Sequence, residues 1–269
     1  MLSEGPRMEQ HLLVAGGRSL AATAWGRIDS EAPVIVMMHG GLDCTSTWKD
    51  LPEAIARTSG LAVLSYDRWG YGGSEAYVGR RERSYRFEES GPVFAEVLRH
   101  FGIRHSVVFG HSDGGAMGLL AAAAHPDAVR GVCACSPTVA LDLPMVRAMA
   151  SARQAFEHGG LREKLVRHHG DKTDAMFWAW YEPWADEAAI AWSMAKQVAE
   201  VRCPVAALFG QDDDYGWRAS ARLLVDHGRM PLELTAIPAV GHDPQHRARA
   251  EVLAALARVA SAAGIAIER

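Results

Sequence analysis

Ser112 stands in a short glycine-rich stretch, Gly110-His111-Ser112-Asp113-Gly114-Gly115, whose residue types are suited to nucleophilic chemistry. An apolar run at 106–109 precedes this stretch, and a segment rich in Ala, Gly and Leu follows it at 115–124. The pattern predicts a buried strand, a tight turn and a buried helix. Such a turn strains the serine backbone. The residues two before and two after it, Gly110 and Gly114, must be small because the strand and the helix pass too close for a Cβ. We therefore predict that Ser112 is a nucleophile at the positive end of a helix dipole.

A serine nucleophile needs a base within hydrogen-bond reach and an acid that orients the base. In a parallel sheet these partners are expected after later strands, in the chain order Ser, acid, His. The apolar run at 205–209 is followed by Asp212, Asp213 and Asp214, which are three candidate acids. Spacing alone does not choose between them.

The base is expected after the last strand. The run at 232–237 leads to Gly241 and His242, and the glycine lets the loop turn sharply. We predict His242 as the base, with His246 in the following helix as the alternative.

Acyl transfer also needs hydrogen-bond donors for the oxyanion that develops on the substrate. One donor is expected from the backbone N–H of Asp113, directly after the nucleophile. The other is expected from the loop His39-Gly40-Gly41-Leu42, which follows the apolar run at 32–38, and we assign it to Gly41.

Continuous apolar runs without alternation indicate strands that are covered on both faces, as in parallel sheets. After an opening hairpin at 11–14 and 20–25, such runs alternate with helical patterns. The expected later strands are 32–38, 61–65, 106–109, 129–134, 205–209 and 232–237, and the expected helices are 45–58, 87–101, 115–124, 220–227 and 244–263. This alternation predicts an α/β fold with a doubly wound, mostly parallel sheet of about eight strands flanked by helices.

The alternation stops at 137–201, where helical character continues without a buried strand. We interpret 137–201 as a helical cap inserted into a core domain made of 1–136 and 202–269. The cap is rich in Met and aromatic residues, most of which should pack within it. The side chains expected to contact the substrate are His111, Trp178, Trp180, Tyr181 and Trp184.

The composition excludes several classes of protein. The net charge is −4, and the Lys and Arg residues are scattered, which argues against a nucleic-acid partner. No apolar run suggests a secretory signal or a membrane span, so we expect no membrane partner and a cytoplasmic protein. Neither a metal site nor a dinucleotide cofactor is expected from the His, Cys and Gly spacings. The expected partner is a small-molecule substrate, and a homo-oligomer is left open.

These motifs together resemble the α/β-hydrolase family over nearly the whole chain. The resemblance rests on His39-Gly40, the loop at 67–74, the Ser112 turn, a G-x-x-D pattern at 210–213 and Gly241-His242. In the family the fourth position of G-x-x-D is the acid, so the resemblance implies a triad of Ser112, Asp213 and His242. It also implies a substrate pocket between the sheet and the cap. Trp69 departs from the family pattern, which usually has Gly there.

Within the family this chain looks most similar to small single-chain hydrolases of esters, lactones and carbon–carbon bonds. We expect a serine hydrolase that cleaves a carboxylic ester or a similar small apolar acyl substrate through an acyl-enzyme. The alternatives are a carbon–carbon bond hydrolase of a vinylogous diketone and a ligand-binding member without turnover. A serine nucleophile argues against the haloalkane dehalogenase and epoxide hydrolase branches, because those need an Asp nucleophile.

Overall fold

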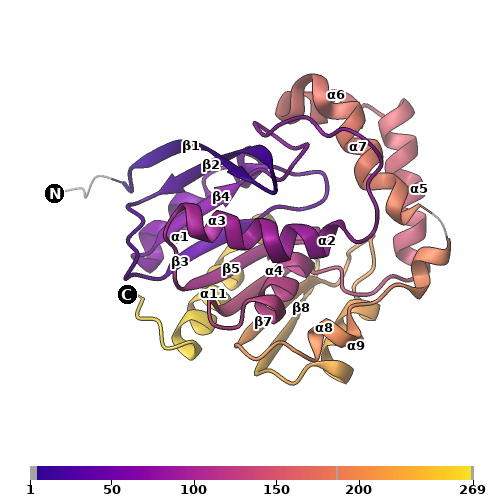
Figure 1. Cartoon of the computed structure of the whole chain (residues 1–269). Helices are drawn as coiled ribbons and strands as arrows, with labels where there is room; N and C mark the ends of the chain where they lie inside the picture. Colours follow the sequence, from indigo (N-terminus) through magenta and orange to yellow (C-terminus); the bar gives the residue numbers. More distant parts are fainter. Residues whose placement is uncertain (1–4, 186, 268–269) are drawn as a thin grey trace.

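The structure, a computed structural model, describes residues 5–185 and 187–267. Its strands are β1 (Met8–Ala15), β2 (Arg18–Trp25), β3 (Val34–Met38), β4 (Ala62–Tyr66), β5 (Ser106–His111), β6 (Val129–Cys135), β7 (Val205–Gly210) and β8 (Leu232–Ile237). Within the described residues they form one eight-stranded sheet in the order β1-β2-β4-β3-β5-β6-β7-β8 (Figure 1). The pairs β1–β2 and β2–β4 are antiparallel, and the other pairs are parallel. The predicted doubly wound, mostly parallel sheet is confirmed.

The strand order brings the loops after β3 and β5 together. From β3 the chain moves to β4 on one side, and it then returns to β5 on the other side of β3. In open α/β sheets such a reversal creates a crevice at the carboxyl ends of the strands, where ligands bind. The residues that follow Met38 and His111 therefore leave the sheet side by side.

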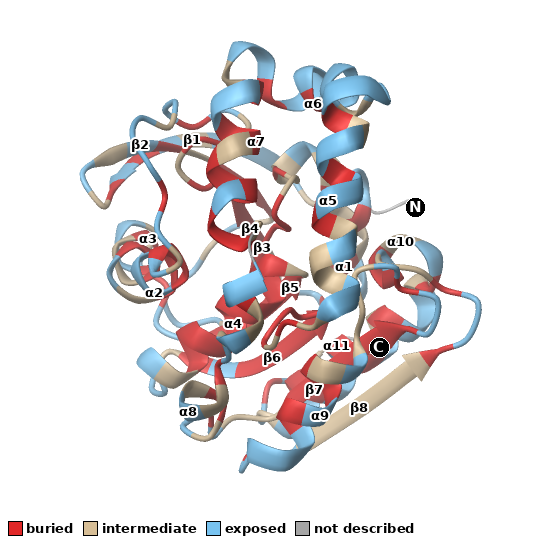
Figure 2. Cartoon of the chain, turned by 90° about the vertical axis from the view of Figure 1, so that its right-hand side faces the viewer, coloured by how far each residue is buried: buried red, intermediate tan, exposed pale blue. Residues whose placement is uncertain are grey.

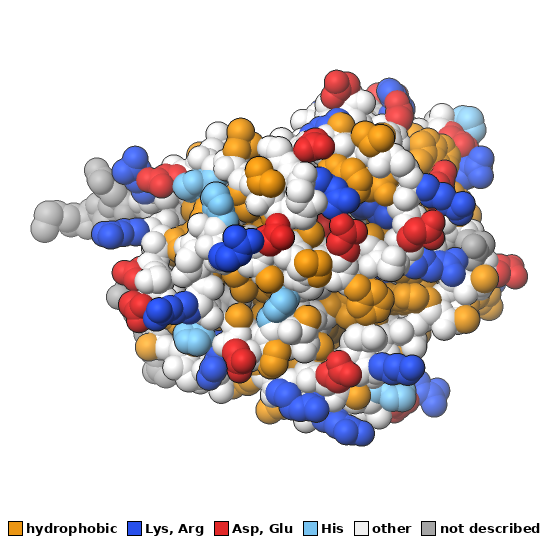
Figure 3. Space-filling view, in the orientation of Figure 1, with side chains coloured by type: hydrophobic (Ala, Val, Ile, Leu, Met, Phe, Trp, Pro, Cys, Tyr) orange, Lys and Arg blue, Asp and Glu red, His pale blue; other side chains and the backbone are white. Residues whose placement is uncertain are grey.

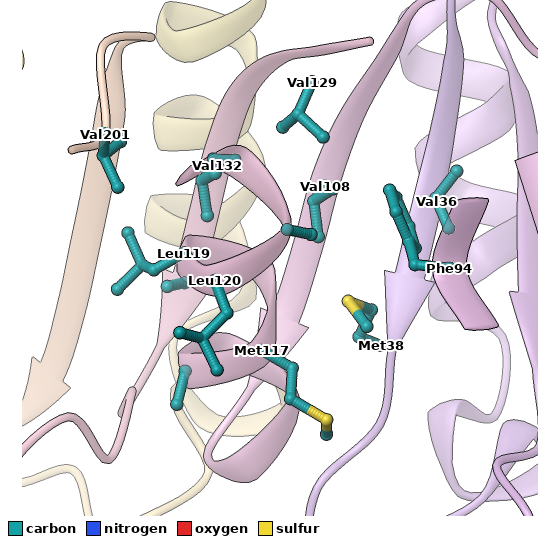
Figure 4. Close-up of a cluster of buried hydrophobic side chains, with 14 of the residues drawn as sticks. Val36, Met38, Phe94, Val108, Met117, Leu119, Leu120, Val129, Val132 and Val201 are labelled. Carbon is teal, nitrogen blue, oxygen red and sulfur yellow. The ribbon is translucent and has the colours of Figure 1, made fainter. Parts of the chain in front are cut away.

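Helices cover both faces of the sheet, which explains why β3 and β5 are buried along their whole length. One apolar core lies under α3 (Phe94–His100), α4 (Asp113–Ala124) and α9 (Arg218–His227). Figure 4 shows part of this core, with Leu119 of α4 close to Val132 of the sheet and Met117 of α4 close to Met38. The opposite core lies under α1 (Leu51–Ser59) and α11 (Arg249–Ala262).

The two edges of the sheet differ. The hairpin β1–β2 turns at Gly16 and Gly17, whose φ angles of 59° and 71° suit a tight hairpin turn, so the predicted hairpin is confirmed. At the other edge β8 is only partly buried apart from Ile237, as its tan colour in Figure 2 shows.

Proline divides two of the predicted helices. The helix expected at 45–58 is a 3₁₀ turn at Thr45–Trp48 followed by α1, because Pro52 is tolerated only in the first turn of an α-helix. The helix expected at 87–101 consists of α2 (Tyr85–Glu88), a π-helical turn at Glu89–Val93 and α3. Pro92 lies within that π-helical turn, where it removes one backbone donor.

The closing helix is also divided. The helix expected at 244–263 is α10 (Pro244–Arg247) followed by α11. Ala248 separates the two helices because its φ of −129° and ψ of 48° lie outside the helical region.

The segment 137–201 holds α5 (Leu143–His158), α6 (Leu161–His169), α7 (Thr173–Tyr181) and α8 (Ala195–Val198). Figure 1 shows α5, α6 and α7 grouped beyond one end of the sheet. They share an apolar cluster in which the rings of Phe156 and Phe177 stack with centroids 3.7 Å apart. By contrast α8 packs into the core of the sheet through Val198. The division of the chain at 137 and 201 stays a prediction.

The surface carries charges of both signs. On the face that Figure 3 shows, basic and acidic side chains are interspersed, so this face has no continuous basic stripe. Among the helices of the described residues, none combines the length and the apolar character that crossing a membrane requires.

Candidate active site

Ser112 lies in a strained turn between β5 and α4. Its φ is 52° and its ψ is −113°, a conformation that costs a non-glycine residue about 1–3 kcal/mol. A Cβ on Gly114 would overlap the carbonyl of Met38, and a Cβ on Gly110 would overlap the backbone of Gly114. These two glycines therefore allow the close approach of β3, β5 and α4 that presents the Ser112 hydroxyl.

The structure brings Ser112, His242 and Asp213 together from the loops after β5, β8 and β7. The distance from Ser112 Oγ to His242 Nε2 is 2.9 Å, and His242 Nδ1 lies 2.8 Å from Asp213 Oδ2. The Asp213 side chain is 1% exposed and the His242 side chain 19%. Asp213 also accepts a bond from the backbone N–H of Tyr215.

The chemistry of the three side chains determines the direction of these hydrogen bonds. The Asp213 carboxylate only accepts, so His242 donates from Nδ1 and its Nε2 is left to accept from the Ser112 hydroxyl. In this tautomer His242 can take the proton of Ser112. Asp212 and Asp214 point to the surface, and His246 lies in α10 with no hydrogen bond to Ser112.

The two expected oxyanion donors border the same cavity as Ser112. Asp113 is the first residue of α4, so its N–H has no acceptor within the helix. Gly41 lies against the indole of Trp180, and a Cβ on Gly41 would overlap Trp180 Nε1. The absence of a side chain at Gly41 thus lets α7 approach the loop after β3.

The Asp113 side chain is buried in an ion network that the sequence reasoning missed. Its carboxylate accepts from Arg68 at 2.7 Å, from Arg86 at 2.5 Å and from the Tyr85 hydroxyl at 2.7 Å. Burial alone would raise the pKa of Asp113, but the charges of Arg86 and Arg68 hold it well below its usual range. The signal in the sequence for this network was an aspartate directly after Ser112, at the start of a helix that was predicted to be buried, since a buried charge needs a cation.

The side chain of His111 occupies the wall of the cavity, next to the nucleophile. Its Nδ1 lies 3.0 Å from Asp43 Oδ2, and its Nε2 lies 3.0 Å from the backbone carbonyl of His242. Both ring nitrogens are therefore engaged by the protein itself, although we expected His111 to contact substrate. Asp43, which belongs to the loop of Gly41, was not singled out in the sequence.

The cavity beside Ser112 has a volume of about 200 Å³. Its apolar wall comes from the cap and the loop after β3, through Leu42, Met145, Met149, Trp180 and Trp184. The polar wall includes side chains of both charges, namely Asp43, Arg86, His111 and Asp243. A larger hollow of about 860 Å³ follows β1 and β2, and Ser112, Asp213 and His242 are not among its lining residues.

The four aromatic residues that we expected to contact substrate divide into two pairs. Trp180 and Trp184 line the cavity. Trp178 and Tyr181 are not among its lining residues, and their rings pack against each other with centroids 5.6 Å apart. The structure thus places only one of the two pairs beside Ser112.

Trp69, the departure from the family pattern, lies outside the cavity lining. The Arg18 guanidinium lies 3.7 Å from the centre of its ring, and Tyr77 packs on it at 4.2 Å. Its indole N–H donates to the carbonyl of Ala76 at 3.0 Å. These contacts assign Trp69 to the packing of its own loop.

His169, the last residue of α6, joins the loop after β3 to the loop after β4. Its Nδ1 accepts from the backbone N–H of Gly72 at 3.0 Å, and its Nε2 donates to the carbonyl of Leu42 at 3.1 Å. Burial lowers the pKa of His169. The neutral ring is therefore the form that holds α6 to the loop of Gly41.

Among the described residues, no group of three His, Cys, Asp or Glu side chains is arranged to hold a metal ion.

Two curated relatives match part of this chain. Epoxide hydrolase B of Mycobacterium tuberculosis is 31% identical over 121 residues, which are 45% of this chain and 33% of that protein. The putative carbamate hydrolase RutD of Stutzerimonas stutzeri is 31% identical over 107 residues, which are 40% of this chain and 38% of that protein. The matches thus span 33% and 38% of the length of these relatives.

Solved structures resemble the whole fold. The 2-hydroxy-6-oxo-6-phenylhexa-2,4-dienoate hydrolase (BphD) from Rhodococcus sp. strain RHA1 gives a TM-score of 0.76 at 18% identity, over 94% of this chain and 99% of that one. Naproxen esterase from Bacillus subtilis gives a TM-score of 0.71 at 17% identity, over 94% of this chain and 91% of that one. At these identities the likeness shows the fold alone.

A family assignment follows from a different comparison. The sequence profile of the α/β-hydrolase fold matches residues 33–201, which is more than half of the chain. The observed strand order and the turn at Ser112 agree with this match. This chain therefore belongs to the α/β-hydrolase fold family.

Proposed function

We propose that this protein is a serine hydrolase that cleaves a carboxylic ester or a similar small apolar acyl substrate. The observation that carries the proposal is the continuous hydrogen-bonded series from Ser112 through His242 to Asp213, with distances of 2.9 and 2.8 Å. A series of this kind in a half-buried cavity activates a hydroxyl that is otherwise a weak nucleophile.

The reaction proceeds in two halves. His242 takes the proton of Ser112 as Oγ attacks the substrate carbonyl, and the protonated His242 then gives that proton to the leaving alcohol. The resulting acyl-enzyme is hydrolysed by a water molecule that His242 activates. Asp213 holds the imidazole in its tautomer and stabilises its charged form. The backbone N–H groups of Gly41 and Asp113, together with the dipole of α4, stabilise the oxyanion in both halves.

The size and lining of the cavity set the substrate class. A volume of about 200 Å³ is below the range of about 300–1,000 Å³ that drug-sized ligands occupy. Met145, Met149, Trp180 and Trp184 provide an apolar surface for the acyl or alcohol group. We therefore propose a small apolar group on at least one side of the scissile bond.

A relative named as an epoxide hydrolase does not change this proposal. Ser112 stands where the resemblance implies that the epoxide hydrolase branch needs an Asp nucleophile. A serine alcohol attacks carbonyl carbon and forms an acyl-enzyme, which is the chemistry of esters and related acyl compounds.

A second candidate function is hydrolysis of a carbon–carbon bond in a vinylogous diketone. The observation that favours it is the polar part of the cavity lining, to which Arg86, Asp43 and Asp243 belong. Such a lining suits a substrate that carries polar groups beyond one carbonyl. The same triad would act after the substrate has ketonised.

The test is hydrolysis of p-nitrophenyl esters from acetate to decanoate by wild type and Ser112→Ala, with thermal unfolding as the control for folding. We expect wild type to prefer short chains, and Ser112→Ala to lose at least about 10⁴-fold in kcat. Substantial turnover by a folded Ser112→Ala protein would exclude Ser112 as the nucleophile. Turnover of a vinylogous diketone far above that of any ester would select the second function. Ligand-induced thermal stabilisation without turnover of either substrate would indicate a binding protein.

A further inference from the structure

His111 occupies a position between two loops of the site. It is the last residue of β5, directly before Ser112, and its side chain is 4% exposed. Asp43, on one side, belongs to the loop after β3 that carries the oxyanion donor Gly41. His242, on the other side, belongs to the loop after β8 that carries the base.

Both hydrogen-bond partners of His111 are acceptors only. The Asp43 carboxylate lies 3.0 Å from Nδ1, and the backbone carbonyl of His242 lies 3.0 Å from Nε2. A neutral imidazole has one N–H and one bare nitrogen, so it can donate only one of these two bonds. Both bonds form together only when the ring carries a proton on each nitrogen.

We infer that His111 is an imidazolium that acts as a positioning residue, because it fastens the oxyanion loop at Asp43 to the backbone of the catalytic base. The geometry around Gly40 supports this assignment independently. A Cβ on Gly40 would overlap Asp43 Oδ2 and lie 2.8 Å from His111 Nδ1, so this position must be free of a side chain for the pair to form. The catalytic part of the inference rests on the proposed hydrolase function.

The charges around His111 favour its protonated form. Asp43 faces it from the loop after β3, and Asp243 faces it at the start of α10, with Oδ1 3.5 Å from Nε2. The other titratable groups near it are His242, whose ring centre is 5.1 Å away, and His246 of α10. Burial alone would lower the pKa of His111, but the hydrogen bond and charge of Asp43 and the charge of Asp243 raise it above its usual value. Burial likewise opposes ionisation of Asp43, and His111 nevertheless holds the pKa of Asp43 below its usual range.

The connection has a mechanistic consequence. The N–H of Gly41 must point at the developing oxyanion, and His242 must keep Nε2 at the Ser112 hydroxyl. Loss of the proton from His111 breaks one of its two bonds and frees one loop. A displacement of about 1 Å at such groups can reduce turnover by up to about 100-fold. The substrate cavity keeps its lining, so KM should change little.

The first measurement is nitrogen-resolved NMR of the imidazole groups, titrated through the ordinary histidine pKa of about 6.5. We expect one of the twelve histidines to keep both ring nitrogens protonated above that pKa, and this signal to be missing in His111→Gln. In Asp43→Asn the same signal should titrate at lower pH. If no histidine keeps both protons above the ordinary pKa, or if the signal survives in His111→Gln, the inference is wrong. This result does not depend on catalytic activity, so it stands or fails separately from the proposed function.

The second measurement is the pH profile of kcat for ester hydrolysis. Wild type should lose activity at alkaline pH as His111 deprotonates, and Asp43→Asn should lose it at lower pH. His111→Gln should have a lower kcat at every pH and lack this alkaline loss. His227→Gln, which changes an exposed histidine at the end of α9, should match wild type. A purely structural role would lower kcat in His111→Gln and leave the shape of the profile unchanged, and that outcome would overturn the inference.

Discussion

The buried carboxylate of Asp113 offers a test of how the site is held together. Replacing Asp113 with Asn keeps the size of the side chain and removes its charge. Two guanidinium groups, those of Arg68 and Arg86, would then lie in the protein interior without their counter-ion. The amide nitrogen of the new side chain would also face a donor, because the native carboxylate accepts from both arginines and from the Tyr85 hydroxyl.

The expected cost follows from burial. The Arg68, Arg86 and Asp113 side chains are each at most 3% exposed, so water does not replace the lost interaction. Removing one partner of a buried ion pair typically costs about 3–5 kcal/mol, because the remaining charge is left unpaired. Domains of this kind are stable by about 5–15 kcal/mol, so the variant should lose a large fraction of its stability.

The assay is urea-induced unfolding at neutral pH, with the free energy of unfolding and the m-value fitted for each protein. Because the folded-state pKa of Asp113 is depressed, its contribution is fully present above the unfolded pKa of about 3.9 and is lost only as pH falls below it. Asp174→Asn is the matched control, because Asp174 makes two bonds to Arg162 on the surface, with side chains that are 51% and 46% exposed. That control should change stability by at most about 1 kcal/mol. If Asp113→Asn costs no more than Asp174→Asn, the buried network does not stabilise the fold as argued.

Two further predictions concern the contact between the cap and the loop after β3. In Gly41→Ala the new Cβ overlaps Trp180 Nε1, so kcat/KM should fall by about 10²-fold as the oxyanion donor moves, and Trp180→Ala in the same chain should restore part of it. No recovery in the double variant, measured with the preferred ester, would contradict the steric explanation. Because burial lowers the folded-state pKa of His169, its bonds to Gly72 and Leu42 should contribute fully above the unfolded pKa of about 6.5 and weaken as pH falls below it. Tryptophan fluorescence of the cap should report this acid transition, and the transition should be absent in His169→Gln. If the transition persists in that variant, the neutral ring of His169 does not hold the cap.

Strand positions were predictable from the sequence because a strand that is buried on both faces consists almost entirely of apolar residues. The runs at 32–38, 106–109 and 205–209 have no alternation, and each coincides with most of a strand of the parallel sheet. The positions of Ser112 and His242 follow from the same signal, because the residues that follow parallel strands gather at one edge of the sheet, where ligands bind.

The interruptions of the helices and the identity of the acid were less accessible. Pro52 and Pro92 are visible in the sequence, but apolar periodicity continues across them, so each helix was predicted as longer than it is. Asp212, Asp213 and Asp214 are consecutive, and only the backbone path after β7 decides that the middle one is buried against His242.

The division of the four aromatic residues could not be predicted from their spacing. Trp178, Trp180 and Tyr181 belong to α7, whereas Trp184 ends the 3₁₀ turn Glu182–Trp184 that follows it. Trp180 and Trp184 line the cavity, and Trp178 and Tyr181 pack together. Residues three or four positions apart lie on one face of an α-helix, but Tyr181 and Trp184 are three apart and nevertheless fall in different pairs.

The charged partners of the site could not be predicted, because they pair across the chain. Asp43 lies 68 positions before His111, and Arg68 lies 45 positions before Asp113. Periodicity within one element carries no information on such pairs. Only the requirement that a buried charge has a partner points to them, and it does not say where the partner is.

The two side chains on either side of Ser112 explain why this site depends on ionic contacts. A loop that borders a substrate cavity cannot be fixed by filling that cavity with apolar side chains. Polar contacts with defined directions hold it instead, and the residues next to the nucleophile are well placed to make them. His111 reaches the oxyanion loop and the loop of His242, while Asp113 reaches Arg68 and Arg86 on the opposite side. The strained serine is thus fixed by β5 and α4, and its two neighbours align the groups that act on it. A substitution at either neighbour should therefore affect the alignment of the site as a whole rather than the reactivity of the serine alone.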